Sequence, residues 1–257
     1  YSNMAKTIFI TGATSGIGQA TAVRLARERH NLILTGRRGE RLEKLKNELT
    51  QRYGCKVHTL CFDVRRRDEV QAAVEQLPAE WQRIDVLVNN AGLAVGLEPL
   101  HEGIADDWER MIDTNIKGLL YVTRAIAPGM VGRRSGHIVN LGSVAGKDVY
   151  PGGAVYCATK HAVDALSKGM RMDFLPYGIR VTQICPGAVE TEFSVVRFKG
   201  DCDRADKVYE GYRALSADDI AEAICYALSQ PEHVDVQDVL VLPAAQADGK
   251  MFHRMKA

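Results

Sequence analysis

Residues 6–38 read KTIFITGATSGIGQATAVRLARERHNLILTGRR and contain a strand, a helix and a second strand in quick succession. Residues 8–10 and 32–34 are short apolar runs typical of buried strands, and apolar residues recur from Ile17 to Ala26 with a helical period. Two strands joined by one helix over so short a distance pair in parallel through a right-handed crossover. This stretch therefore predicts an α/β fold.

The turn between the first strand and the helix is rich in glycine. Gly12, Gly16 and Gly18 follow a G-x-x-x-G-x-G spacing. Glycines in such a turn let backbone N–H groups approach a pyrophosphate at the positive N-terminus of the helix. A tight structural turn is the alternative, but the position after a strand and before a helix favours dinucleotide binding.

The second strand ends in Thr35, Gly36, Arg37 and Arg38. Sites that use NAD usually place an acidic residue here for the ribose 2′-hydroxyl, and an acidic group would repel a 2′-phosphate. Arginine instead binds a phosphate through charge-assisted hydrogen bonds. We therefore expect NADP(H), with one arginine on the phosphate and the other in solvent. The alternative is that both only begin the charged helix that follows.

The alternation of strands and helices continues along the chain. Further strands are expected at residues 56–62, 84–88, 137–141, 180–185 and 238–242, and further helices at residues 68–77, 106–130, 154–174 and 216–228. The third strand leads into Asp63 and Val64, which we expect at the adenine. The strand at 84–88 runs into Asn89-Asn90-Ala91-Gly92, and small residues there allow a cofactor to approach the backbone closely.

A possible proton-transfer group lies in the second half of the chain. Ser143, Tyr156 and Lys160 fall within eighteen residues, and the last two are four apart. On a helix this spacing places the phenol and the ammonium on one face. A nearby lysine favours the phenolate and lowers the pKa of the phenol, so that Tyr156 can exchange protons with a substrate oxygen. The alternative is an amphipathic helix with a snorkelling lysine.

The composition is that of an ordinary globular protein of 257 residues, with 46% hydrophobic and 25% charged residues. Its 33 basic and 32 acidic residues nearly cancel, so net charge gives no reason to expect binding to nucleic acid or to a membrane. No apolar run approaches the roughly 18 residues of a membrane span. The N-terminus lacks the profile of a secretory signal. Six cysteines without a C-x-x-C pair or a histidine cluster favour free thiols in a reducing cytoplasm and no metal site.

The chain shows no internal repeat, low-complexity run or linker, and we expect one domain over residues 4–257. Tyr1, Ser2 and Asn3 precede Met4 and are expected to be left over from expression. Residues 188–215 begin without a clear period yet contain large apolar side chains, which predicts an irregular lid or substrate loop beside the site. Residues 244–257 form a C-terminal tail.

Short motifs are spread along the chain in a characteristic order. They are TGATSGIG at residues 11–18, NNAG at residues 89–92, Asn115, Ser143, Y-x-x-x-K at Tyr156 and Lys160, and PG at Pro186 and Gly187. Together they resemble the short-chain dehydrogenase/reductase family over essentially residues 6–243. The resemblance implies a Rossmann-type, doubly wound, seven-stranded parallel sheet of strand order 3-2-1-4-5-6-7 with helices on both faces. It also implies a homotetramer, in which the helices at 106–130 and 154–174 pack across a two-fold axis.

The resemblance also assigns roles to the matching residues. Tyr156 would be the general acid/base, and Lys160 would hold the nicotinamide ribose and lower the pKa of the tyrosine. Ser143 would hydrogen-bond the substrate oxygen, and Asn115 would hold a water in a proton relay. The residues expected to bind the cofactor, NADP, are Gly12, Ser15, Gly16, Ile17, Gly18, Arg37, Arg38, Asp63, Val64, Asn90, Ala91, Gly92, Tyr156, Lys160, Pro186, Gly187, Val189 and Thr191.

Within the family, TEFSVVRFKGD at residues 191–201 and the His253-Arg254 pair resemble the NADP-dependent 3-hydroxy acid dehydrogenases. Those enzymes oxidise L-serine, L-allo-threonine and related acids such as 3-hydroxypropionate. A carboxylate substrate needs a cation outside the shared motifs. We expect Arg197, or Arg254 from the tail of a neighbouring subunit, to supply it, and a surface salt bridge is the alternative for Arg197. Val144 and Phe193 are expected beside the substrate.

Two other functions stay open. A 3-oxoacyl-carrier-protein reductase, or another carbonyl reductase of the family, would need a basic patch beside the cleft for its acidic partner. The candidate arginines for such a patch are Arg124, Arg133, Arg134 and Arg171. An NADP-sensing regulatory module without turnover is the alternative of another class, and the intact catalytic set argues against it.

Overall fold

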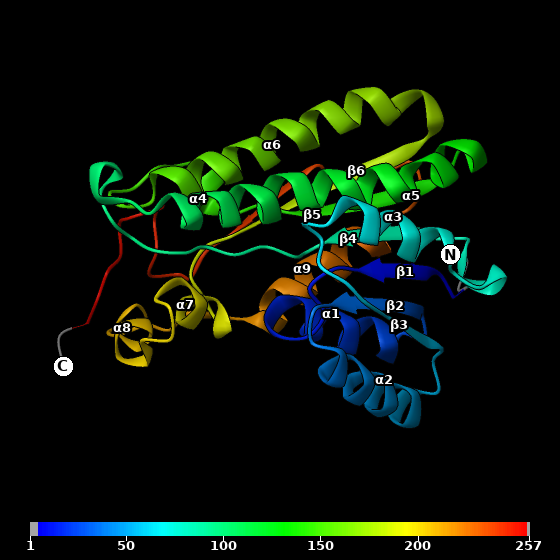
Figure 1. The fold of residues 1–257 in the computed structure, drawn as a ribbon, viewed down its shortest axis with the longest axis horizontal. Helices are drawn as coiled ribbons and strands as arrows, with labels where there is room; N and C mark the ends of the chain where they lie inside the picture. The colour runs from blue at the N-terminus through cyan, green and yellow to red at the C-terminus, as the bar shows by residue number, and fades with distance from the viewer. Residues whose placement is uncertain (1–4, 256–257) are drawn as a thin grey trace.

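The structure, a computed structural model, describes residues 5–255, which form a parallel sheet covered by helices on both faces (Figure 1). Tyr1, Ser2 and Asn3 lie outside the described residues. The strands are β1 (Thr7–Ile10), β2 (Asn31–Gly36), β3 (Val57–Cys61), β4 (Val86–Asn89), β5 (Gly136–Leu141), β6 (Ile179–Pro186), β7 (Val189–Glu190), β8 (Leu215–Ser216) and β9 (Asp238–Val241). The α-helices are α1 (Gly16–Arg27), α2 (Gly39–Tyr53), α3 (Arg67–Glu75), α4 (Ala105–Ile112), α5 (Leu119–Arg133), α6 (Ala154–Phe174), α7 (Glu192–Arg197), α8 (Cys202–Lys207) and α9 (Ala217–Ser229).

The strand order confirms the predicted doubly wound fold. Within residues 5–255, seven strands form the main sheet in the order β3-β2-β1-β4-β5-β6-β9, and each neighbouring pair is parallel. The last strand is β9 because two short strands, β7 and β8, precede it and pair with each other. None of the helices described is both long enough and apolar enough to cross a membrane.

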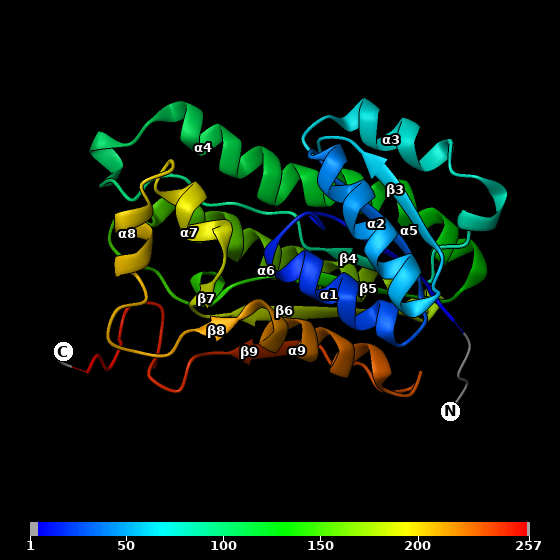
Figure 2. The ribbon, with the colours of Figure 1, turned by 90° about the horizontal axis from the view of Figure 1, so that it is seen from below.

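Successive side chains of each strand point to opposite faces of the sheet. Helices cover both faces, so both sets of side chains are buried. In β1, Ile8 and Ile10 pack in the cluster that includes α1, α2 and α9, whereas Phe9 packs with α3, α5 and α6. Figure 2 shows α1, α2 and α9 in front of the strands and α5 and α6 behind them. The helix predicted at residues 154–174 coincides with α6, the helix that carries the tyrosine and the lysine.

The helical stretch predicted at residues 106–130 is not one regular α-helix. Between α4 and α5 the chain forms a π-helical segment, Asp113–Gly118, which contains Asn115. The Asn115 Oδ1 accepts a hydrogen bond from the Leu93 N–H, and its Nδ2 donates to the Leu93 carbonyl oxygen. These bonds hold the helix against the chain that follows β4. Such π-helical turns occur often at functional sites.

Within the substrate loop expected at residues 188–215, an irregular segment is predicted from residue 188 to 203, and that part of the prediction is wrong. The loop contains β7, α7, α8 and β8. Its helices are six residues long, too short for a hydrophobic period to show in the sequence. Thr191 and Asp201 cap them, because each side chain accepts a hydrogen bond from a backbone N–H of the first turn. The described part of the tail lies against this segment, where the Met255 N–H donates to the Gly211 carbonyl oxygen.

The close packing of the glycine-rich turn can be tested at Gly18, which lies inside α1. A methyl group there would come within 2.3 Å of the Gly12 carbonyl oxygen and 2.5 Å of Asn90 Nδ2. We expect Gly18→Ala to lower the free energy of unfolding by about 1–3 kcal/mol, because a packed turn must shift. Gly132→Ala in α5 is the matched control, since its methyl group would meet no atom within 4 Å. Urea unfolding of both variants decides, and a Gly18→Ala protein as stable as the Gly132→Ala protein would contradict this packing.

Candidate active site

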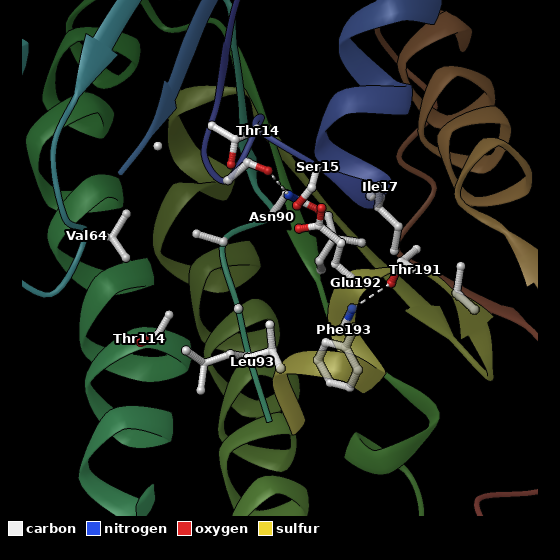
Figure 3. Close-up of a pocket in the computed structure, with 18 of the residues that line it drawn as sticks. Thr14, Ser15, Ile17, Val64, Asn90, Leu93, Thr114, Thr191, Glu192 and Phe193 are labelled. Carbon is white, nitrogen blue, oxygen red and sulfur yellow. Dashed lines mark hydrogen bonds between the residues drawn. The ribbon is translucent and has the colours of Figure 1, made fainter. Parts of the chain in front are cut away.

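A cavity of about 350 Å³ lies at the carboxyl edge of the sheet, where β1, β4, β5 and β6 end beside one another. Parallel pairing brings the loops that follow these strands to one edge, where open α/β sheets bind their ligands. The glycine-rich turn forms one wall and the start of α7 the other. In Figure 3, Thr14 and Ser15 of the turn lie opposite Glu192 and Phe193 of α7.

Tyr156 and Lys160 lie one helical turn apart on α6, and both are buried at the cavity. The Lys160 Nζ donates to the Leu141 carbonyl oxygen at 2.9 Å and lies 6.0 Å from the centroid of the Tyr156 ring. Gly146 lets the turn after β5 approach α6, because a Cβ there would come within 2.6 Å of the Lys160 carbonyl oxygen. The end of β5 and the tyrosine–lysine face of α6 are thereby held together.

Burial shifts the pKa values of both groups. Desolvation raises the pKa of the Tyr156 phenol above its usual value of 10, although the Ser143 hydroxyl and the Arg197 guanidinium favour the phenolate. Desolvation lowers the pKa of Lys160 from 10.5 to about 8. Lys160 Nζ lies 6.0 Å from the Tyr156 ring centroid, and its own effect on the pKa of the phenol stays a prediction. The cost of burying the phenolate is larger than the favourable interactions around it.

Ser143 lies directly after β5 and lines the cavity beside Tyr156. Its Oγ accepts a hydrogen bond from the Ala145 N–H at 3.1 Å and so caps a short 3₁₀ turn, Val144–Gly146. The hydroxyl hydrogen is not used in this bond and can be donated to the Tyr156 oxygen or to a substrate oxygen. Val144 is buried and is not among the described residues that line the cavity.

Asn115 lies behind the cavity rather than in its wall. Its Nδ2 donates to the Thr159 Oγ1 as well as to the Leu93 carbonyl oxygen, which uses both amide hydrogens on the protein itself. A Cβ at Gly92 would lie 3.3 Å from Asn115 Oδ1 and 3.5 Å from Lys160 Nζ. The absence of a side chain at Gly92 therefore lets the amide and the ammonium approach the cavity from behind.

The far end of the cavity is lined by arginine and hydroxyl groups. Arg38 donates from Nε and Nη2 to Thr14 Oγ1 and from Nη2 to Ser15 Oγ. Arg37 is exposed and also lines the cavity. Asp63, expected at the adenine, lines the cavity but forms an ion pair with Arg65 at 2.6 Å. Two cationic side chains with neighbouring hydroxyls fit a dinucleotide that carries an extra phosphate on its adenosine ribose.

A model of the short chain dehydrogenase family matches residues 6–201. The chain belongs to the short-chain dehydrogenase family. It is 50% identical over 249 residues to an NADP-dependent 3-hydroxy acid dehydrogenase of Salmonella typhi, covering 96% of this chain and 99% of that one. It is 46% identical over 245 residues to sulfoacetaldehyde reductase 2 of Chromohalobacter salexigens, covering 95% and 96%. It matches the closed form of a serine dehydrogenase complexed with NADP+ at a TM-score of 0.91 and 45% identity, covering 97% and 100%. The resemblance expected from the motifs is confirmed.

The cavity of this short-chain dehydrogenase gathers most of the residues that the sequence singled out. Its wall includes Gly12, Ser15, Gly16, Ile17, Arg37, Arg38, Asp63, Val64, Asn90, Ala91, Gly92, Ser143, Tyr156, Lys160, Pro186, Gly187, Val189, Thr191 and Phe193. Gly18 is not in the described lining and instead packs against Gly12. Arg254 lies elsewhere: its guanidinium stacks on Tyr212 and donates to the Val208 carbonyl oxygen at 3.0 Å.

Several residues that line the cavity were not predicted from the sequence. They are Thr14, Gly36, Phe62, Leu93, Thr114, Leu141, Gly142, Glu192 and Val196. Thr14 lies inside the quoted glycine-rich motif and could have been named from it. Glu192 gave no signal, because an acidic residue at the start of a short helix is ordinary. In residues 5–255, no group of three or more His, Cys, Asp or Glu side chains is placed to hold a metal ion.

The burial of Lys160 predicts a gain in stability when its charge is removed. A pKa lowered from 10.5 to about 8 means that the folded chain disfavours the ammonium. We expect Lys160→Met to raise the free energy of unfolding of the cofactor-free protein at pH 7 by about 1–3 kcal/mol, less than the full shift because the Leu141 carbonyl loses its donor.

The dependence on pH fixes the sign of this effect. Between pH 8 and 10.5 the unfolded wild-type chain binds more protons at this lysine than the folded chain does. The free energy of unfolding of the wild type therefore rises with pH, and its difference from that of Lys160→Met becomes smaller. Urea unfolding from pH 7 to 10 measures this difference. Lys168→Met, an exposed lysine on the same helix, is the control and should show no gain. A Lys160→Met protein less stable than wild type at pH 7, or a stability difference that stays constant with pH, would show that burial does not disfavour the charged form of Lys160.

Proposed function

We propose that this short-chain dehydrogenase uses NADP(H) to interconvert a small 3-hydroxy acid and the corresponding 3-oxo acid, with Tyr156 as the general acid/base. L-Serine, L-allo-threonine and 3-hydroxypropionate are the substrates to test first. The observation that carries the proposal is a buried guanidinium nitrogen beside Tyr156 that has no hydrogen-bond partner among the described residues.

That atom belongs to Arg197, the last residue of α7. The guanidinium lies 5.6 Å from the centroid of the Tyr156 ring. Its Nη1 donates to the Tyr150 hydroxyl at 3.0 Å, and its Nε donates to the Gly96 carbonyl oxygen at 3.4 Å. Its Nη2 is buried and finds no hydrogen-bond partner among the described residues. A buried charged donor without a partner is costly, and a substrate carboxylate would satisfy it.

The named substrates of the relatives support an anion at this position. In a 3-hydroxy acid one carbon lies between the carbon that bears the hydroxyl and the carboxylate. In sulfoacetaldehyde one carbon lies between the carbonyl carbon and the sulfonate. A cation close to Tyr156 suits both compounds. Arg197 is not in the described cavity wall, so the substrate would reach it by passing Phe193 and Val196, which are in the wall.

The proton is handled by residues of the chain, while the nicotinamide, when bound, accepts or supplies the hydride. Burial keeps Tyr156 protonated at neutral pH, and this form donates a proton to a carbonyl oxygen during reduction. Ser143 would give the same oxygen a second hydrogen bond. During oxidation the phenolate accepts the hydroxyl proton, and Ser143 and Arg197 are groups that favour the phenolate.

Lys160 and Asn115 would support this chemistry from behind. Lys160 uses one of its three N–H donors on the Leu141 carbonyl oxygen, which leaves two for the hydroxyls of the nicotinamide ribose. Asn115 has both amide hydrogens bonded to the protein, so the water of a proton relay would have to bind the remaining lone pair of its Oδ1. We therefore expect Asn115 to act mainly by positioning the chain around Gly92.

The carrier-protein alternative is disfavoured by the position of its basic patch. Arg133 donates to the Ile84 carbonyl oxygen, just before β4, and Arg134 donates to the Pro176 carbonyl oxygen, shortly before β6. Both arginines therefore lie at the amino edge of the sheet. The cavity is at the carboxyl edge, so a partner bound to these arginines would not reach it.

Assembly and location are further parts of the proposal. Leu120 on α5 and Met172 on α6 are 38% and 74% exposed. Exposed apolar side chains on these two helices are compatible with the two-fold packing of a homotetramer. The cysteines of the described chain are free thiols, which is compatible with a reducing cytoplasm.

The role of Arg197 is tested by comparing an acid with its neutral ester. We expect Arg197→Met to lower kcat/KM for 3-hydroxypropionate by about tenfold to a hundredfold, the value of a hydrogen bond to a charged group. For methyl 3-hydroxypropionate the loss should be clearly smaller, because the ester places no charge at the guanidinium and only the effect of Arg197 on the Tyr156 phenolate is lost. Steady-state kinetics with NADP measure both.

Arg204→Met is the matched control, because Arg204 stacks on Phe198 in the same segment and lies outside the described cavity wall. That variant should keep the wild-type ratio of kcat/KM for the acid to kcat/KM for the ester. Equal losses for the acid and the ester in Arg197→Met would show that the arginine does not bind the substrate carboxylate. Higher wild-type activity on acyl thioesters than on free acids would favour the carrier-protein reductase instead.

A further inference from the structure

We propose that Glu192 is an internal competitor for the 2′-phosphate of NADP, so that its carboxylate occupies the cation site of the cofactor until the phosphate displaces it. The inference rests on the proposed use of NADP(H) and adds a residue that sets cofactor affinity. Neither Glu192 nor its partner Arg41 belongs to the motifs that define the family.

The geometry around Glu192 is that of a bound anion. Its Oε2 accepts a hydrogen bond from Arg38 Nη1 at 2.9 Å, and its Oε1 accepts one from Arg41 Nη1 at 2.8 Å. The two arginines hold the pKa of this carboxyl below its usual range. Figure 3 shows the Glu192 side chain pointing across the cavity toward Ser15. A carboxylate from α7 thus lies between side chains of α2 and the glycine-rich turn.

The site that Glu192 fills is the one a 2′-phosphate needs. Arg38 already donates to Thr14 and Ser15, which fixes the position of its guanidinium at the end of β2. Its Nη1 is the donor spent on Glu192. A phosphate carries more charge than a carboxylate and would be repelled by Glu192 if both stayed on the same arginines. A phosphate that uses Arg38 would therefore replace the carboxylate there, and binding would lose part of its free energy to this exchange.

The position of Glu192 in the chain links this exchange to the substrate side. Thr191, the residue before it, caps α7 through a hydrogen bond from the Phe193 N–H at 3.2 Å. Phe193, the residue after it, packs on Tyr156 with ring centroids 5.7 Å apart. The same turn of helix therefore holds the anion at the cofactor end and an aromatic side chain against the phenol. An NAD molecule, without the phosphate, would leave the Glu192 pairs in place.

The test is a binding titration of Glu192→Gln with NADPH and NADH, followed by nicotinamide fluorescence. We expect the variant to bind NADPH about twofold to tenfold more tightly than wild type, as the loss of two exposed ion pairs allows. Its affinity for NADH should stay within about twofold. Calorimetry with 2′-phospho-ADP-ribose and ADP-ribose should give the same contrast without the nicotinamide.

Two further variants make the result specific. Glu190→Gln removes an equal charge two residues away, from a side chain outside the described cavity wall, and should bind both cofactors as wild type does. In an Arg41→Gln background the gain from Glu192→Gln should shrink, because one of the two ion pairs is already gone. Unchanged or weaker NADPH binding in Glu192→Gln would overturn the proposal, as would equal tightening of NADH or an undiminished gain in the Arg41→Gln background.

The outcomes separate this inference from the function on which it rests. Wild-type and Glu192→Gln proteins that both bind NADPH no more tightly than NADH would refute the use of NADP and the competition together. Wild-type protein that prefers NADPH, combined with no tightening in Glu192→Gln, would refute the competition alone.

Discussion

A buried ammonium at the end of β5 is the constraint on which the site depends. Lys160 is enclosed by α6, the turn after β5 and the chain at Gly92, and within residues 5–255 its ammonium has one hydrogen-bond acceptor, the Leu141 carbonyl oxygen. Desolvation disfavours its charge, so the fold maintains the site at a cost in stability. We expect part of that cost to be recovered if ligand hydroxyls occupy the remaining donors, as proposed above. Because Gly92 and Gly146 have no side chains, the backbone at both positions can lie close to Lys160.

The fold could be predicted from the sequence because its signals are local. The strand–helix–strand pattern of residues 6–38 requires parallel pairing, and α6 begins and ends where the hydrophobic period predicted. The prediction failed where a few hydrogen bonds decide the structure. The π-helical turn at Asn115 depends on the backbone of Leu93, twenty-two residues earlier. The short helices α7 and α8 depend on single capping side chains.

Most residues of the site could be predicted from the sequence, but the pKa shifts and ion pairs among them could not. The motifs identified the tyrosine, the lysine, the serine and the arginines after β2. They could not show that burial outweighs the cations around Tyr156 and raises the pKa of its phenol. Nor could they show that Glu192 meets Arg38, 154 residues away in the chain. Such pairs form only after folding, and neither spacing nor composition records them.

The central claim is that Tyr156 transfers the proton while the rest of the cavity binds the cofactor. The most direct measurement compares Tyr156→Phe with wild type for NADPH affinity and for turnover of 3-hydroxypropionate in the same preparation. We expect Tyr156→Phe to bind NADPH within about threefold of wild type, while turnover falls by at least about a hundredfold, the usual contribution of a general acid/base. Turnover close to that of wild type in a variant that still binds NADPH would contradict the claim.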